Sequence, residues 1–446
     1  MTAIRFLFAL IDGGGNVPPE LHAARRLMER GHAVTVIADD SVAADVRSIG
    51  TRARRWVRAP NRRDRRPEND PTRDWECKYP WQLVDRLLET ALIGPAARYA
   101  DDVNLAIAER RPAAVVCSMF CVGGMVAAEA AGIPFVVLFP NIYPLPARGL
   151  PPFGIGLRPA RGRLGRLRDD LLNRLIEWLW DRKGLQGLNE LRARYELEPL
   201  GHVLDQVRRA DRQLVMSSAA LDFPATLPSG ARYVGPVLDD PHWSESTPWT
   251  PRAGTNPLVL VAMSSTFQDQ IGSLQRAIDA LGTLPVRAVV TAGPALDPAS
   301  LRPAANVTVV TSAPHREVLR HAAVVITHGG HGTVVKALAA GVPMVLLPHG
   351  RDQADTAVRV AARDAGVMLK RSAGAAEIAA AVRVVLQDDS YRAAAERLGE
   401  MIRRDAAGDV LVRELEAAAA GSDFRYRLSS RTHGEGATAG RRAGTA

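Results

Sequence analysis

The sequence predicts a protein of the α/β class with two domains, each built on a parallel β-sheet. The chain has 446 residues, which suits two domains of roughly 200 residues better than one large core. Two separate series of strand-like apolar runs alternate with helix-like runs, which is the pattern of parallel sheets. A proline-rich stretch without helical period lies between the two series, as expected of a linker.

Composition narrows the class of protein. Hydrophobic residues make up 47% of the chain and charged residues 24%, which is typical of a globular protein. No run approaches the roughly 18 apolar residues of a membrane span, and the first apolar run lacks the flanks of a signal peptide, so we expect a cytoplasmic protein. The formal charge of +9 comes from arginine clusters that aspartates interrupt and that match no nucleic-acid-binding pattern. Three cysteines without zinc-ligand spacing indicate neither a disulfide framework nor a metal site.

The first predicted domain covers residues 1–225 and opens as a parallel βαβ unit. The apolar run from Ile4 to Ile11 predicts a strand, and Gly13 to Gly15 predict the turn that ends it. A helix is predicted from Pro19 to Arg30, where apolar residues recur at helical spacing, and a strand from Ala33 to Ala38. The doubly wound pattern continues with a helical stretch near 83–109, a strand at 113–117, a helix that ends before residue 132, and a strand at 135–139.

Two stretches of the first domain have no regular period. Residues 47–80 are rich in arginine, proline and aspartate, which predicts a long, partly mobile insertion of the kind that often contacts substrate. Residues 140–165 are rich in proline and glycine and lead into an amphipathic region at 167–195. We interpret the second stretch as another loop on the acceptor side.

The linker is predicted at residues 226–250 and the second domain at 251–421. A tail at 422–446 has few apolar anchors and is predicted to be disordered. The elements expected in the second domain are strands at 258–263, 287–291, 307–310, 324–327 and 344–347, a helix at 269–281, and a last helix at 410–420.

The most informative segment starts at Val324 and reads VVITHGGHGTVVKALAAGVPMVLLPHGRDQADTAVRV. An apolar strand ends at Thr327, a glycine-rich turn follows, and a helix is expected to begin near Thr333. Backbone N–H groups and the positive end of a helix dipole then lie at the carboxyl edge of a strand, where phosphates bind in parallel α/β domains. His328 adds a side-chain donor and Thr333 could reach a phosphate oxygen, so the turn suits a pyrophosphate. The alternative is a tight turn capped by Thr333.

The next strand supports a ligand site rather than a simple turn. It ends at Pro348, and Asp352 and Gln353 then open the following helix at a neighbouring strand end. A carboxylate beside an amide can bind adjacent hydroxyls of a sugar. The two segments together predict a site for a sugar nucleotide.

The full run resembles the donor-binding signature of the UDP-glycosyltransferase family, whose members use nucleotide sugars and include plant and bacterial natural-product enzymes. It has the bacterial form, because plant members carry a tryptophan-containing version. Four other segments match in order and spacing, and the resemblance covers most of the chain from Ile4 to about Ala420. These segments are GGGNVPPELHAARRLMERGHAVTVIA, AAEAAGIPFVVL, YVGPV and VAMSSTFQDQ.

The resemblance implies a GT-B fold with two facing Rossmann-like domains, the acceptor bound in the first and the sugar nucleotide in the second. It also implies inverting transfer without a metal ion. Our leading hypothesis is transfer of a hexose or deoxyhexose from UDP or dTDP to a small natural-product-like acceptor, with no further cofactor. The interrupted arginine clusters favour no nucleic-acid partner. Asp352 and Gln353 should hold the sugar; oligomeric state stays open. The residues expected to hold the diphosphate are Ser265, Thr266, His328, Gly329, Gly330, Gly332 and Thr333.

The pattern departs from the family at the acceptor side. Members that glycosylate alcohols carry a general-base histidine after the first glycine turn and an aspartate that orients it. Here the two positions hold Asn16 and Ser118, neither of which is a base near neutral pH. Asp12, at the end of the first strand, is the nearest substitute and His22 a weaker one.

Several explanations of this departure remain open. Another side chain could be the base, or the acceptor could itself be acidic or nucleophilic. The chain could also be a noncatalytic helper or binding protein with the same fold. A nucleotide-sugar epimerase is a further alternative.

Overall fold

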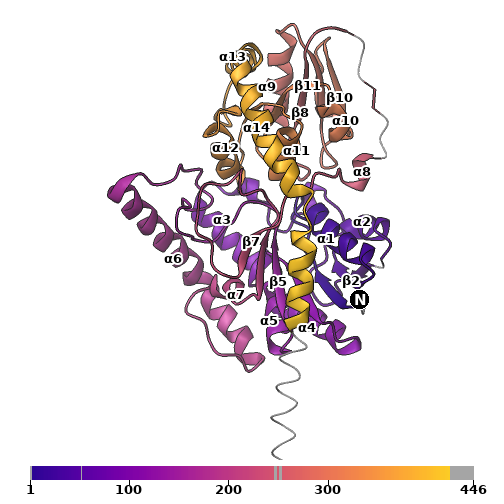
Figure 1. Ribbon diagram of the computed structural model, residues 1–446, viewed down its shortest axis with the longest axis vertical. Coiled ribbons are helices and arrows are strands. Elements are labelled where there is room, and N and C mark those ends of the chain that lie inside the picture. Colours follow the sequence, from indigo (N-terminus) through magenta and orange to yellow (C-terminus); the bar gives the residue numbers. More distant parts are fainter. Residues whose placement is uncertain (1–2, 52, 246–248, 251–253, 422–446) are drawn as a thin grey trace, which may run out of the picture.

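The computed structural model describes residues 3–51, 53–245, 249–250 and 254–421. Two domains follow each other along the long axis, with the N-terminal domain below and the C-terminal domain above in Figure 1. Each domain is built on one parallel sheet, so the predicted GT-B architecture is confirmed. The tail at 422–446, predicted to be disordered, lies outside the described residues.

The N-terminal sheet has seven strands in the order β3-β2-β1-β4-β5-β6-β7, and every paired neighbour is parallel. Its order reverses between β1 and β4, where Leu7 pairs with Thr35 on one side and Val115 on the other. Ligands bind at such reversal points in open parallel sheets. The strands are β1 (Arg5–Ala9), β2 (Ala33–Ala38), β3 (Ala53–Arg55), β4 (Ala114–Ser118), β5 (Phe135–Phe139), β6 (Arg212–Val215) and β7 (Ala231–Tyr233).

The C-terminal sheet has six parallel strands in the order β10-β9-β8-β11-β12-β13 and reverses between β8 and β11. Thr327 at the end of β11 pairs with Ala262 of β8 and with Leu346 of β12, so three strands end side by side. The strands are β8 (Leu258–Ala262), β9 (Arg287–Thr291), β10 (Val307–Val310), β11 (Ala322–Thr327), β12 (Met344–Leu346) and β13 (Gly366–Met368).

Helices cover both faces of each sheet, which explains why the central strands are buried along their whole length. The helices are α1 (Val17–Glu29), α2 (Ala43–Ser48), α3 (Pro80–Leu87), α4 (Ala96–Glu109), α5 (Val122–Ala130), α6 (Gly162–Arg194), α7 (Asp205–Arg208), α8 (His242–Glu245), α9 (Ile271–Gly282), α10 (His315–Leu319), α11 (His331–Ala339), α12 (Gln353–Ala361), α13 (Ala375–Gln387) and α14 (Asp389–Ala406). Short turns of 3-10 or π helix are η1 (Asp40–Val42), η2 (Pro67–Asn69), η3 (Asp74–Glu76), η4 (Leu88–Leu92) and η5 (Pro298–Ser300).

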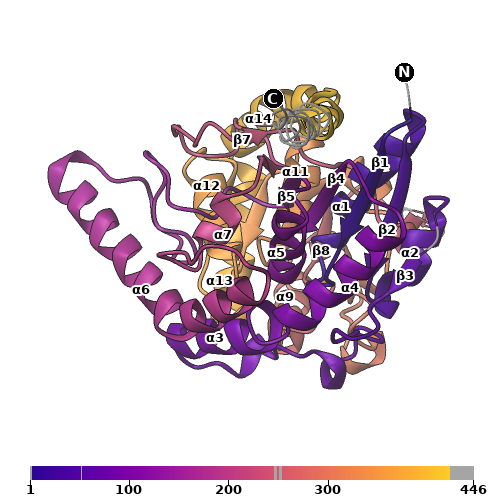
Figure 2. The ribbon, with the colours of Figure 1, turned by 90° about the horizontal axis from the view of Figure 1, so that it is seen from below.

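Alternate residues of each strand enter different cores, as the two-residue repeat of a strand requires. Leu7 of β1 belongs to a core with α4 and α5, whereas its neighbour Phe8 belongs to a core with α1 on the other face. Figure 2 shows the N-terminal sheet between these layers, with α6 projecting away from the body. None of the helices in the described part of the chain has the length and apolarity needed to cross a membrane.

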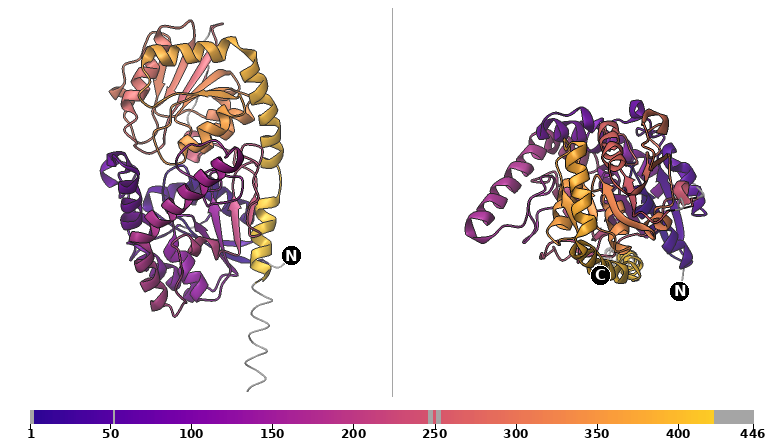
Figure 3. Two further views of the ribbon diagram at one scale, coloured as in Figure 1. Left: turned by 90° about the vertical axis from the view of Figure 1, so that its left-hand side faces the viewer. Right: turned by 90° about the horizontal axis from the view of Figure 1, so that it is seen from above.

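Two elements differ from the sequence prediction. Strand β7 lies inside the stretch 226–250 that we interpreted as linker, and it adds an edge strand to the N-terminal sheet. The last helix, residues 410–421, follows the C-terminal domain in sequence but packs on the N-terminal one, since Leu411 and Leu415 lie in the core with β1. The left view of Figure 3 shows the C-terminal helices running from one domain to the other.

The chain therefore crosses between the domains twice, once after β7 and once after α14. The two crossings touch. Gly235 has a φ of 84°, and a Cβ at this residue would overlap the carbonyl oxygen of Asp405. The hydroxyl of Ser218 donates to the carboxylate of Asp405 at 2.5 Å. Glycine is needed at 235 because the backbone there is left-handed and because the carbonyl of Asp405 leaves no room for a Cβ.

The arginine-rich insertion, which we predicted to be partly mobile, is anchored to the N-terminal sheet at several residues. Its Arg62 and Arg65 form ion pairs with Asp70 and Asp12, each at 3.0 Å and largely buried. Trp56 is 1% exposed and donates to the carbonyl of Leu10. These anchors place the far end of the insertion, η3, beside the C-terminal domain.

Candidate active site

The predicted donor-binding residues lie in three loops that leave neighbouring strands at one edge of the C-terminal sheet. Ser265 and Thr266 follow β8, His328 follows β11, and Asp352 precedes α12 after β12. The side-chain amide of Gln353 pairs with that of Gln268 at 2.7 Å, which joins the first and third loops. The structure therefore brings these residues to the reversal point of the sheet.

The turn after β11 needs its glycines for specific reasons. Gly329 has a φ of 90°, a conformation that other residues adopt at a cost. A Cβ on Gly330 would lie 2.6 Å from Nε2 of His328, so a side chain there would displace the imidazole. A Cβ on Gly332 would meet no atom within 4 Å. Space for a ligand thus remains directly over the first turn of α11.

Helix α11 begins at His331, two residues earlier than the sequence predicted, with Gly330 as its N-cap. Thr333 therefore lies inside the first turn and does not act as the cap. The N–H groups of a first turn have no acceptor within the helix, and the helix dipole makes this end positive. The turn can bind an anion through its backbone.

His328 is a neutral hydrogen-bonding group. It is 7% exposed, and burial lowers its pKa to about 3, with the charges of His349 and Arg351 acting in the same direction. Its Nδ1 lies 3.4 Å from Oγ1 of Thr327. A neutral imidazole can donate one hydrogen bond to a phosphate but supplies no positive charge.

Asp352 and Gln353 differ in how firmly they are held. Gln353 is 2% exposed, and its Oε1 accepts from the N–H groups of His349 and Gly350. The carboxylate of Asp352 accepts a long hydrogen bond from Nδ2 of Asn141, at 3.4 Å, across the domain interface. Burial raises the pKa of Asp352. The carboxylate of Asp352 is the more available of the two for a ligand hydroxyl.

Arg351 is a site residue that the sequence reasoning missed. Its Nε donates to Oδ2 of Asp74 at 2.5 Å, and its Nη1 donates to the carbonyl of Gly13 at 3.2 Å and to Oγ1 of Thr266 at 3.3 Å. Its backbone is left-handed, with a φ of 55°. A single guanidinium therefore contacts the insertion, the first glycine turn and the loop after β8.

The two domains face each other at their reversal points. A Cβ on Gly14 would lie 2.6 Å from Cγ2 of Thr266, so the first glycine turn touches the loop after β8. Trp75 of the insertion packs edge-on against Phe267, with ring centroids 5.0 Å apart. The acceptor side and the donor side thus share one interface.

Asn16 and Ser118, which occupy the positions of the family's histidine and aspartate, do meet. Nδ2 of Asn16 lies 3.4 Å from Oγ of Ser118 and donates to the carbonyl of Ile11 at 2.9 Å. Oδ1 of Asn16 accepts from the N–H of Gly13, also at 2.9 Å. Asn16 is therefore fixed in the turn, and neither side chain can accept a proton near neutral pH.

Glu20 is the second residue that the sequence reasoning missed. It is fully buried in α1, and its Oε2 accepts from Nδ2 of Asn16 at 3.1 Å. Its Oε1 has no hydrogen-bond partner within the described part of the chain. Burial raises the pKa of Glu20 from 4.5 to about 8, against the hydrogen bonds from Ser118 and Asn16, and the charge of Asp12 adds to the rise. An ionised Glu20 could accept a proton beside both substituted positions.

Asp12 has a different environment from that expected of a base. Its carboxylate accepts two hydrogen bonds from Arg65, at 3.0 and 3.1 Å, and one from Ser41 at 2.8 Å. Burial favours a higher pKa, but the charge and hydrogen bonds of Arg65, with help from Arg62 and Ser41, hold the pKa of Asp12 below its usual value. We therefore assign Asp12 to anchoring the insertion. His22 faces Asp239 at 3.1 Å, away from the glycine turn.

The proline-rich loop at 140–165 reaches the donor side, as a loop that covers a site would. The N–H groups of Gly154 and Gly156 donate to the carboxylate of Asp355 in α12, at 2.7 and 3.1 Å. Burial raises the pKa of Asp355 to about 6, although both hydrogen bonds oppose the rise. The loop thus docks one turn beyond Asp352.

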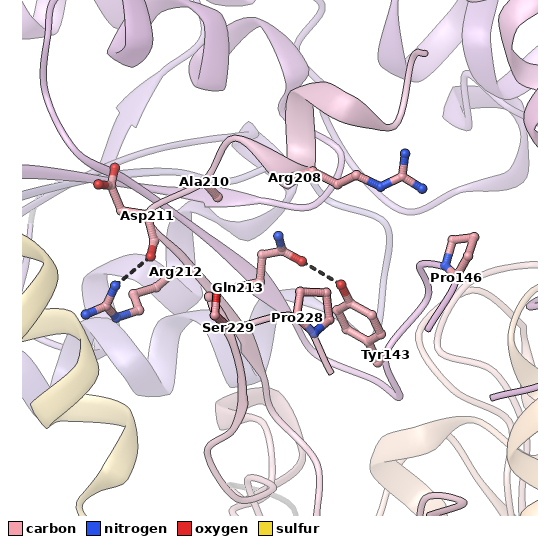
Figure 4. Close-up of a pocket in the computed structure, with 10 residues that line it drawn as sticks. Tyr143, Pro146, Arg208, Ala210, Asp211, Arg212, Gln213, Pro228 and Ser229 are labelled. Atoms are coloured by element: carbon pink, nitrogen blue, oxygen red, sulfur yellow. Dashed lines mark hydrogen bonds between the residues drawn. The ribbon is translucent and has the colours of Figure 1, made fainter. Parts of the chain in front are cut away.

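A pocket of about 400 Å³ lies elsewhere in the N-terminal domain. It is lined by the start of β6 and by Tyr143, whose hydroxyl donates to Oε1 of Gln213 at 2.8 Å (Figure 4). Asn16 follows the carboxyl end of β1, whereas Arg212 lies at the amino end of β6. The pocket is therefore separate from the interface that holds the predicted site.

Comparisons with known proteins identify the family of the chain. Residues 189–411, half of the chain, match the model of the family described as UDP-glucoronosyl and UDP-glucosyl transferase. The chain is 31% identical over 432 residues to 4'-demethylrebeccamycin synthase of Lentzea aerocolonigenes. The matched region covers 91% of this chain and 98% of the relative.

Two crystal structures have the same fold. The calicheamicin glycosyltransferase CalG4 superposes with a TM-score of 0.72 at 23% identity, covering 94% of this chain and 99% of the other. The glycosyltransferase VinC, solved in complex with dTDP, gives a TM-score of 0.65 at 19% identity, covering 94% and 100%. With the sequence match, these likenesses show that the chain is a glycosyltransferase and belongs to the UDP-glycosyltransferase family.

Proposed function

We propose that the enzyme transfers a hexose or deoxyhexose from a UDP- or dTDP-sugar to a small natural-product-like acceptor. In this proposal the transfer inverts the anomeric carbon and needs no metal ion. The observation that carries the proposal is the convergence of three loops, after β8, β11 and β12, around the open space at Gly332. These loops offer backbone donors to a diphosphate and a carboxylate to a sugar.

The diphosphate would bind over the first turn of α11. Its charge would be stabilised by the N–H groups of that turn, by the helix dipole and by a hydrogen bond from His328. These groups act on the same developing charge that a divalent cation neutralises in other transferases. They support transfer without a metal ion.

Inversion is supported by the opposition of the two domains. The first glycine turn lies against Thr266, so an acceptor in the N-terminal domain would approach the anomeric carbon from the N-terminal side. The diphosphate would leave towards α11, on the C-terminal side. A single displacement between groups on opposite faces inverts the carbon.

The acceptor class is supported by the names of the similar proteins, one a rebeccamycin synthase and one a calicheamicin glycosyltransferase. The donor nucleotide is supported by the structure of VinC with dTDP. Because the positions of the family's base hold Asn16 and Ser118, acidic acceptors such as phenols would be favoured.

Calorimetric titration with UDP and with dTDP tests the donor. We expect saturable binding of at least one, and absence of binding for both would overturn the proposal. Transfer from a panel of UDP- and dTDP-sugars to phenolic acceptors then tests the stereochemistry by NMR of the product anomer. Retained configuration, or activity that EDTA abolishes and Mg²⁺ restores, would contradict inversion or metal independence. A new nucleotide sugar formed without any acceptor would indicate an epimerase.

A further inference from the structure

We propose that Arg351 binds the diphosphate of the donor, and that in the ligand-free enzyme the carboxylate of Asp74 occupies the place of a phosphate on Arg351. This inference deepens the proposed function and rests on it. It adds Arg351 to the residues that bind the donor, and it makes Asp74 of the insertion a competitor of the diphosphate for Arg351.

Arg351 lies next to residues that are assigned to the donor. Nη1 of Arg351 lies 3.3 Å from Oγ1 of Thr266, a residue that the family resemblance assigns to the diphosphate. Arg351 directly precedes Asp352, which is expected to hold the sugar. The guanidinium thus contacts a residue assigned to the diphosphate, and its backbone adjoins the residue expected to hold the sugar.

The other predicted donor-binding groups carry too little positive charge for a diphosphate. The diphosphate of a nucleotide sugar carries two negative charges, and His328 is neutral near pH 7 because burial lowers its pKa to about 3. The dipole of α11 supplies only about half a positive charge. A guanidinium is charged at every working pH and matches phosphate oxygens in a planar fork. Arg351 would supply the charge that the predicted residues lack.

The carboxylate of Asp74 is only partly satisfied by its hydrogen bonds. Its Oδ2 accepts from Arg351, but its Oδ1 is buried and has no hydrogen-bond partner in the described residues. The pair is therefore held at one oxygen rather than two. A phosphate that offers two oxygens to the guanidinium can replace Asp74 and lose nothing in charge. The side chain of Arg351 is 30% exposed, so a ligand can reach it.

The backbone supports the same assignment. Arg351 has a left-handed φ of 55°, a conformation that is strained for a residue with a Cβ. Strain of this kind persists where surrounding contacts hold it, and it concentrates at ligand sites. From this turn the side chain of Arg351 reaches Asp74 and Gly13 across the interface.

A purely structural reading makes a different prediction. If the ion pair only held the two domains together, Arg351→Gln and Asp74→Asn would remove the same interdomain contact. Both substitutions would then weaken ligand binding. If Asp74 competes with the diphosphate, the two substitutions act in opposite directions. The sign of the Asp74→Asn effect therefore separates the two readings.

The test is calorimetric binding of UDP and dTDP to the full chain and four variants. We expect Arg351→Gln to raise the Kd by about 10- to 100-fold, Arg351→Lys to raise it less, and Asp74→Asn to lower it several-fold. In the double variant the effect of Asp74→Asn should vanish. Uridine or thymidine, which have no phosphate, should bind Arg351→Gln and wild type equally.

A matched control is Arg371→Gln, which removes an ion pair at 2.9 Å with Asp269 in the loop after β8 and should leave the Kd unchanged. Equal diphosphate binding by wild type and Arg351→Gln would overturn the inference, as would weaker binding by Asp74→Asn. Both results would leave the proposed function standing. If wild type binds neither UDP nor dTDP, the proposed function itself fails.

Discussion

Replacing Glu20 by glutamine should change how the stability of the enzyme depends on pH. Burial raises the pKa of Glu20 from 4.5 to about 8 in the folded chain. Between these two pH values the folded chain therefore keeps a proton on Glu20 that the unfolded chain has released. The folded state binds more protons in this range, and the free energy of unfolding therefore falls as the pH rises from 4.5 to 8. Glutamine has nearly the same shape as glutamate and cannot ionise. The free energy of unfolding of the Glu20→Gln variant should therefore not fall in this way as the pH rises.

The size of the effect follows from the same two values. At about 1.4 kcal/mol for each pH unit, the interval between 4.5 and about 8 sets a limit of about 5 kcal/mol. Between pH 6 and pH 8 the linkage relation gives about 2 kcal/mol. The advantage of Glu20→Gln over wild type should grow by this amount across that range.

Urea unfolding of both proteins at pH 6 and pH 8 measures the difference. Because two domains need not unfold together, the free energy is taken from the transition that the substitution shifts. Glu29→Gln is the control, since Glu29 lies in the same helix with a side chain 54% exposed, and its difference from wild type should stay constant. If the difference for Glu20→Gln is also constant, Glu20 is not a buried, protonated carboxyl and the reasoning is refuted.

Three other predictions concern binding and transfer. Above pH 8, where Glu20 is ionised, Glu20→Gln should slow transfer to an alkyl alcohol by about 10²- to 10⁴-fold. Transfer to 4-nitrophenol should slow far less, because an acidic acceptor needs no base, and equal losses would count against Glu20 as a proton acceptor. His328→Ala should weaken UDP or dTDP binding by about tenfold, by the same factor at pH 5.5 and pH 8, because the imidazole stays neutral. Gly332→Ala should weaken diphosphate binding, measured by calorimetry, and leave the melting temperature unchanged. Gly330→Ala should weaken binding and also displace His328, which thermal unfolding would detect.

Local patterns in the sequence were sufficient for the framework and for the donor turn. Apolar runs of four to six residues define β8 and β11, and the turn after β11 carries its own glycines and His328, so neither depends on distant contacts. Strand β7 has three residues and therefore too short a pattern to be separated from a linker. The helix at 410–421 has a clear period, but a period does not state which sheet the helix covers.

The site residues that were missed depend on long-range contacts. Arg351 and Asp74 are 277 residues apart, and no local pattern predicts their ion pair. Glu20 could have been found, because it lies four residues after Asn16 and three after Val17, on the face of α1 that Leu21 and Ala24 bury. A carboxyl on the buried face of a helix is rare enough to mark a candidate.

The paired crossings at Gly235 and Asp405 have a mechanical consequence. One flexible connection would let the domains turn about any axis, whereas two connections in contact restrict rotation to an axis that passes through both. Such a rotation would separate groups that touch across the interface, the glycine turn from Thr266 and Arg351 from Asp74. Donor binding and release of the nucleoside diphosphate would then both require the same opening of the domains. A substitution that restricts the backbone at Gly235 would slow both steps.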